Sequence, residues 1–344
     1  SHRHPRGDLL GGRHMTSTTP PTAASAASAA SAAGGATAAR TQILDRGYRH
    51  YDGPRTGTSG AMRSVVKYTA QRALGIHRKF RYKIVPILVI AISFVPHIVW
   101  VGIIVLTNRL DEQSDGVMPA GVGRMVANEL VKDYPGSYGS IVLAIALFAA
   151  FVAPEVLCTD RSSGMLGLYL ASPLNRTRYL AAKAMAIGML LSIITVGPAL
   201  VMLTGYTSQG YGPDGFGDWI VTLARVLGVG VAIAAFHTLI AAAISSITTR
   251  RAAASATFIV LVLGAGVLAT LSLVELRAPM WVGAFDLVQL PSEFAYRVFG
   301  RPGPLSYWPR PPLDTWVVYA GFFGWMAVSL LVIWDRYRRA EVTK

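Results

Sequence analysis

Two histidines lie within long apolar stretches of the sequence, where an ionisable side chain is costly and is a functional candidate. His97 falls near the middle of the first of these stretches, and His237 lies past the middle of the fourth. Either side chain could line a transport pathway or relay protons. A neutral histidine that is hydrogen-bonded to a neighbouring helix explains both positions equally well.

Motifs for catalysis and for cofactor binding are absent from the sequence. It contains no G-x-x-x-x-G-K-[ST] phosphate loop, no H-E-x-x-H and no G-x-S-x-G. Cys158 is the single cysteine, which excludes a disulfide framework within the chain and a multi-cysteine metal site. We therefore expect no catalytic residue, no bound cofactor and no metal. Any ATP and Mg²⁺ used in its work would be bound by another chain.

The composition indicates a membrane protein. Of the 344 residues, 52% are hydrophobic and 15% are charged, and the mean hydropathy is +0.43. Soluble domains carry about 25% charged residues. The formal net charge of +14 would suit nucleic-acid binding in a soluble chain, but a cytoplasmic face beside anionic lipid is the competing explanation here.

Six apolar runs are each close to the roughly 20 residues that cross a bilayer as a helix. Inside the bilayer the backbone must satisfy its own hydrogen bonds, so we predict helices for all six. The fold class expected is an all-α integral membrane protein, with a transmembrane domain over residues 84–335. The expected spans are about 84–106, 139–157, 184–204, 219–245, 255–275 and 316–334.

The regions outside the spans differ in composition. Residues 1–60 are rich in Ala and Ser, which predicts a mostly flexible cytoplasmic tail. Residues 61–83 have the pattern of a basic amphipathic helix, which could lie in the membrane interface or pack on protein. The last external loop, about 277–315, mixes aromatic residues with prolines and is expected to be structured. Residues 336–344 form a basic cytoplasmic end.

The distribution of Lys and Arg predicts the orientation. With both termini inside, the inner loops and flanks hold 16 of these residues and the external loops hold 7. Cytoplasmic loops carry the excess of positive charge. Both termini are therefore expected in the cytoplasm, in a prokaryotic plasma membrane.

The inner loop after the second span has the most informative sequence. A short helix at about Ser162–Leu170 would place Asp160 near its N-terminal end, where an acidic group complements the helix dipole. Met165 and Leu168 would then project as an apolar knob that could dock on an ATPase. The alternative is that the loop only anchors the protein at the membrane surface.

The inner loop and its flanks contain, in order, Pro154, Glu155, Asp160, Arg161, Gly164, Leu168, Tyr169, Pro173, Arg176, Tyr179 and Lys183. In this pattern the segment resembles the permease subunits of ATP-binding-cassette exporters of the six-helix ABC-two class. The resemblance implies an exporting subunit that uses ATP hydrolysed by separate ATP-binding-cassette ATPase subunits, together with a second permease copy or paralogue. Because the spans are predominantly apolar with few charges, a lipid or an amphipathic drug fits as the substrate slightly better than a sugar.

The resemblance gives the inner loop a coupling role. The expected contacts with the ATPase are Asp160, Arg161, Gly164, Met165, Leu168, Tyr169, Pro173 and Arg176. Additional contacts with the same partner are expected at Tyr48, Tyr51, Arg55, Arg336 and Arg338. The alternative function is a non-transporting structural or anchoring subunit of a membrane complex.

Overall fold

The computed structural model describes residues 57–76, 79–113, 133–165, 174–304, 307 and 309–339. All of them belong to one unit, Thr56–Lys344. Every regular element within these ranges is helical. The elements are α2 (Gly57–Ala73), α3 (Arg81–Gln113), α5 (Gly136–Ser140), α6 (Val142–Ser162), α8 (Arg176–Ser208), α9 (Gly215–Ile247), α10 (Arg251–Val274), the 3₁₀ helix η1 (Met280–Phe285), α11 (Leu290–Val298) and α12 (Thr315–Arg339).

Six of these helices are long and apolar enough to cross a membrane, which confirms the all-helical class and the six predicted spans. They are Lys83–Leu110 within α3, and α6, α8, α9, α10 and α12. Several extend beyond the predicted limits, and the third runs from Arg176 to Ser208 rather than from 184 to 204. The apolar runs mark the part of each helix that can cross the hydrocarbon, whereas α8 begins before its apolar run, in a segment whose Lys183 pairs with Asp160 of α6.

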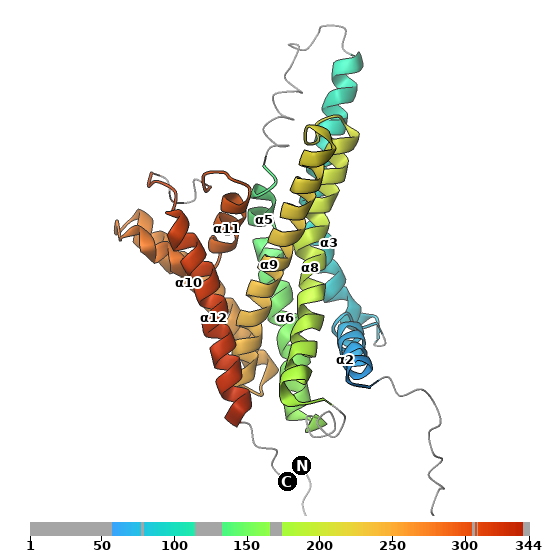
Figure 1. The fold of residues 1–344 in the computed structure, drawn as a ribbon, viewed down its shortest axis with the longest axis vertical. Helices are drawn as coiled ribbons and strands as arrows, with labels where there is room; N and C mark the ends of the chain where they lie inside the picture. Colours follow the sequence, from blue (N-terminus) through green and yellow to red (C-terminus); the bar gives the residue numbers. More distant parts are fainter. Residues whose placement is uncertain are drawn as a thin grey trace, which may run out of the picture. The chain divides into compact units, whose positions relative to one another are not determined.

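The long helices alternate in direction along the chain, and α6, α8 and α9 form the centre of the bundle (Figure 1). Between 56% and 72% of the most apolar window of each central helix is buried, against 22–33% for α3, α10 and α12. Helices α8 and α9 approach closely at Gly230, where a Cβ atom would lie 2.6 Å from Val196 Cγ2. The Thr195 hydroxyl donates to the Gly230 carbonyl at 2.7 Å. A side chain at position 230 would therefore force these helices apart.

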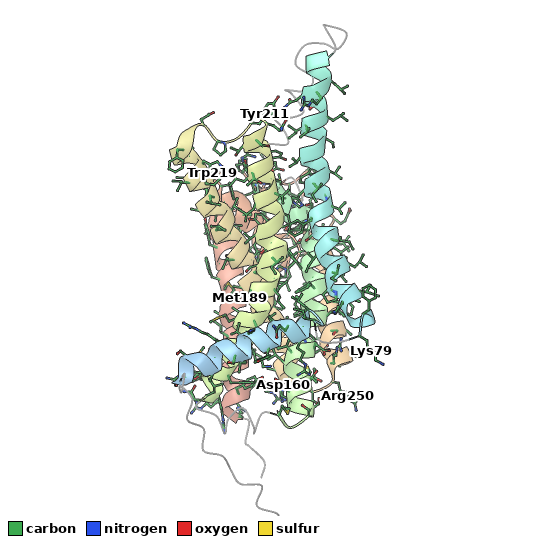
Figure 2. The ribbon with its side chains drawn as sticks, turned by 90° about the vertical axis from the view of Figure 1, so that its right-hand side faces the viewer. Lys79, Asp160, Met189, Tyr211, Trp219 and Arg250 are labelled. Carbon is green, nitrogen blue, oxygen red and sulfur yellow. The ribbon has the colours of Figure 1, made fainter. Side chains whose placement is uncertain are left out.

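Helix α2 lies across the long helices near one end of the bundle (Figure 2). Its buried residues Val65 and Ala73 face protein, and Val65 packs in one cluster with Leu174 and Ala182 of the α8 region. Contact of α2 with the membrane interface stays a prediction. We expected one helix over 61–83, but α2 ends at Ala73 because Gly75 (φ +68°) adopts a left-handed conformation typical of helix ends.

The connection between α10 and α12 is held by a buried carboxylate. Asp286 Oδ1 accepts hydrogen bonds from the backbone N–H groups of Val288 (3.1 Å) and Gln289 (2.9 Å), which begin the turn into α11. Its Oδ2 accepts from the hydroxyls of Thr270 and Tyr307, each at 3.1 Å. Burial raises the pKa of Asp286, and these hydrogen bonds oppose that shift.

Helix α11 packs on α12 through stacked aromatic rings. The rings of Phe294 and Phe322 lie 4.1 Å apart, centroid to centroid, and are nearly parallel. Glu293 of α11 is fully buried, with its Oε2 3.3 Å from Arg297 Nη2. Burial raises the pKa of Glu293 to about 7, although Arg297 lowers it.

Candidate functional site

A buried charge network joins three helices at one end of the bundle. Lys183 Nζ of α8 lies 2.7 Å from Asp160 Oδ2 of α6, and the two side chains are 2% and 1% exposed. The Tyr179 hydroxyl donates to the same carboxylate oxygen at 2.8 Å. Arg72, in the last turn of α2, donates to Asp160 Oδ1 at 3.1 Å. Asp160 is thus the shared acceptor of α2, α6 and α8.

The local sequence explains how α8 positions the side chains of Tyr179 and Lys183. Asn175 is the N-cap of α8, and its side chain accepts a hydrogen bond from the Arg178 backbone N–H at 3.1 Å. Tyr179 and Lys183 are four residues apart, so they lie on the same face of the helix. Both therefore reach the carboxylate of Asp160. Figure 2 shows Asp160 near α2, at the end of the bundle opposite Tyr211 and Trp219.

The C-terminal end of α9 lies beside this network and is capped by cationic side chains. Arg161 of α6 donates to the carbonyl of Ser246, and Arg336 of α12 donates to the carbonyl of Ile247 at 3.3 Å. The last carbonyls of a helix have no partner within it, and positive charge is favourable there. These contacts tie α6 and α12 to α9.

A second ion pair joins α6 to the start of α10. The Arg251 guanidinium contacts the Glu155 carboxylate, whose side chain is 9% exposed. The pair lies at a cavity of about 180 Å³ that is otherwise mostly apolar, with Phe148, Val152 and Val89 among its lining residues. Among the described residues, no group of three His, Cys, Asp or Glu side chains could hold a metal ion.

A comparison with known protein families identifies the family of this helical bundle. The family model described as "ABC-2 family transporter protein" matches residues 15–342. The chain belongs to the ABC-2 transporter family. No curated protein matches it. The chain is therefore the membrane subunit of an ABC transporter, an integral membrane protein with six candidate spans. ABC-2 permeases have no nucleotide-binding site of their own and generally pair with an ABC ATPase.

One predicted contact of this ABC-2 permease is in an unexpected place. We expected Asp160 near the N-terminal end of a short cytoplasmic helix, but it lies within α6, which continues to Ser162. Its buried side chain is occupied by Lys183, Tyr179 and Arg72. The placement was wrong because α6 extends past its apolar run. Lys183, which belongs to the same pattern of residues as Asp160, is buried against it.

The other predicted contacts of the permease are distributed around this end. Met165 is 37% exposed, and Gly164 has a φ of +68° that favours glycine. Arg176 is exposed, as are Arg336 and Arg338 of α12. Outside the described residues lie Leu168, Tyr169, Pro173, Tyr48, Tyr51 and Arg55. Contact of any of these residues with an ATPase stays a prediction.

The two histidines of the permease are buried within their helices. Nδ1 of His97 lies 2.9 Å from the Ser93 carbonyl, and Nδ1 of His237 lies 2.9 Å from the Ile233 carbonyl. Each contact is with the residue four positions earlier in the same helix. His97 also lies against the backbone of Ser137, in the neighbouring short helix α5. A pathway role stays a prediction.

Sequence reasoning missed that Arg72 reaches Asp160. Arg72 looked like one of several basic residues on the polar side of an amphipathic helix. The signal that could have found the network is that Asp160, Tyr179 and Lys183 all belong to the pattern that carries the family resemblance.

Proposed function

We propose that the chain is the permease of an exporter in which two permeases pair with two separate ABC ATPase subunits. The second permease would be another copy or a paralogue. ATP and Mg²⁺ would be held by the ATPases. Membership of the ABC-2 family supports transport, and the buried Asp160–Lys183 pair carries the argument for coupling.

The pair joins the two helices that flank residues 163–175. Because both charges are buried, separating α6 from α8 would break their close ion pair in a region of low dielectric constant, which is costly. A force applied by an ATPase to the intervening segment would therefore move α6 and α8 together. Arg72 extends this unit to the crossing helix α2.

The orientation follows from the excess of Lys and Arg at this end. With both termini in the cytoplasm, α2 lies at the inner membrane surface, and η1 and α11 form a structured element at the outer side. Met165 and Arg176 are exposed at the inner end and are available to a partner.

The spans suit a lipid or an amphipathic drug as the substrate. They are predominantly apolar and carry few charges, and the cavity beside Glu155 and Arg251 combines apolar walls with three charged side chains, the third of which is Arg72. A sugar would require more polar groups than these described walls offer.

Co-purification tests the proposal. The chain would be co-expressed with candidate ABC ATPases, purified and assayed for ATP hydrolysis. We expect a stable complex whose hydrolysis rate changes when the permease is present and responds to phospholipid or amphipathic drugs. A complex with hydrolysis indifferent to the permease would favour the anchoring alternative.

A further inference from the structure

An apolar groove runs along α12 beside η1, at the end of the bundle where α12 begins. It encloses about 630 Å³, and every residue that lines it is apolar. From η1 it is lined by Trp281, Ala284 and Phe285, and from α12 by Trp316, Val317, Ala320, Gly321, Gly324, Trp325 and Val328.

The walls of the groove are held together by direct contacts. The indole N–H of Trp325 donates to the Ala284 carbonyl at 3.0 Å. At Gly321 the helices are so close that a Cβ atom would lie 2.9 Å from the Cβ atom of Ala284. The groove is therefore formed before any ligand enters it.

The length and position of the groove match one leaflet of a bilayer. Its lining extends along α12 from Trp316 to Val328, which is about 18 Å at the rise of an α-helix. Half of the hydrocarbon thickness is about 15 Å. Trp316 is in the first turn of α12 and is 65% exposed, and tryptophan favours the level of the lipid headgroups.

A cationic side chain lies at the headgroup end. Arg310 Nη2 donates to the Ala278 carbonyl at 3.2 Å and lies 3.5 Å from Met280 Sδ, the first residue of η1. Within the part of the chain that the structure describes, no partner is seen for its Nε and Nη1 atoms. A guanidinium group at the level of the headgroups is complementary to a lipid phosphate.

We propose that this groove binds one acyl chain of a membrane phospholipid, with the lipid phosphate on Arg310. The groove lies on the surface of a single permease, at the end of the bundle opposite the buried charge network around Asp160. An anionic phospholipid is preferred, because Arg310 then meets a net negative headgroup. The proposal does not depend on an ATPase or on transport.

Quenching of tryptophan fluorescence tests the site, because Trp281, Trp316 and Trp325 line it. The purified protein would be titrated in detergent with phosphatidylglycerol or phosphatidylcholine brominated on the acyl chains. We expect saturable quenching that is tighter for phosphatidylglycerol. Quenching that rises without saturation and equally for both lipids would show only annular lipid and would overturn the proposal.

Two glycines provide a matched pair of variants. Gly324 lines the groove, and a Cβ atom there would meet nothing within 4 Å, so Gly324→Leu should fill the groove without a clash at its Cβ atom. Gly264 of α10 also has open space and does not line the groove, so Gly264→Leu is the control. Only Gly324→Leu should remove the saturable component. If it leaves that component intact, or alters only the oligomeric state, the groove is not the lipid site.

Variants of Arg310 test the headgroup contact. Arg310→Gln should weaken phosphatidylglycerol binding by about tenfold, the value of one charge-assisted hydrogen bond. Arg310→Lys should retain most of the preference, and Arg178→Gln, which removes an exposed charge at the other end, should retain all of it. Equal binding by Arg310→Gln and the unmodified protein would contradict the phosphate contact.

Discussion

Replacement of Lys183 by methionine should strongly destabilise the permease. Methionine preserves most of the volume and removes the charge, which leaves the Asp160 carboxylate buried at 1% exposure without its closest cation. Removing one partner of a buried ion pair costs about 3–5 kcal/mol. Arg72 and Tyr179 still contact the carboxylate, at 3.1 and 2.8 Å. We therefore expect the lower end, about 3 kcal/mol, which corresponds to a fall in Tm of roughly 4 °C for a chain of this size.

A second substitution separates the lost charge from lost packing. In the double variant Asp160→Asn, Lys183→Met neither side chain is charged, and the asparagine oxygen can still accept from Tyr179. Replacing both members of a buried pair is often nearly neutral, so the double variant should recover most of the Tm. The control is Arg339→Gln, which breaks an exposed pair with Asp335 and should change stability by less than about 1 kcal/mol.

The assay is thermal unfolding of the purified protein in one detergent at one pH, with all variants arranged as a double-mutant cycle. A double variant at least as unstable as Lys183→Met alone would refute the reasoning. The destabilisation would then come from packing around position 183 and not from an unpaired Asp160.

Three further predictions concern orientation, the tail and pH. In a background with the buried Cys158 replaced by serine, Leu276→Cys should react with an impermeant thiol reagent from outside and Arg250→Cys should not; the opposite sidedness would reverse the orientation. Deleting residues 1–40 should leave assembly and ATP hydrolysis intact, because this stretch offers little apolar surface for packing, and loss of the complex on gel filtration would show a docking role. Burial raises the pKa of Glu293 to about 7 from an ordinary value of 4.5. The stabilisation of the folded state that depends on protonated Glu293 is therefore complete below pH 4.5 and is lost as the pH rises through 7. The Tm should therefore fall between pH 5 and 8, and Glu293→Gln should reduce that fall; an identical pH profile in the variant would show that Glu293 does not titrate in this range.

The six spans could be predicted from the sequence because each depends only on the length of a local apolar run. The ends of α6 and α8 could not be predicted in this way. A charged residue such as Asp160 or Lys183 usually marks the end of a membrane span. Here the two charges neutralise each other across α6 and α8. Such pairing depends on how helices are placed side by side, which a single sequence does not give. Arg72 was missed for the same reason, since its partner is 88 positions away.

The turn at Gly75 also could not be predicted from the periodicity of the apolar residues. The pattern of apolar residues continues past Ala73, but the left-handed conformation of Gly75 ends α2 and allows α3 to start in a new direction. The connection between α10 and α12 gave a clearer signal. Its prolines and aromatic residues predicted structure, whereas the role of the buried Asp286 depends on contacts with Thr270 and Tyr307 that a single sequence does not give.

The most direct test of the coupling account is transport-linked ATP hydrolysis by the assembled transporter with Leu168→Asp in the segment between α6 and α8. A charge on an apolar surface that docks on a partner costs several kcal/mol, whereas exposed positions tolerate such changes within about 0.5 kcal/mol. The matched control is Leu276→Asp, at a leucine that is 78% exposed at the other end of the bundle. We predict that Leu168→Asp inserts and folds but loses the ATPase or its substrate-stimulated hydrolysis, while Leu276→Asp keeps both. Full ATPase binding and transport by Leu168→Asp would contradict the assignment of this segment as the coupling element.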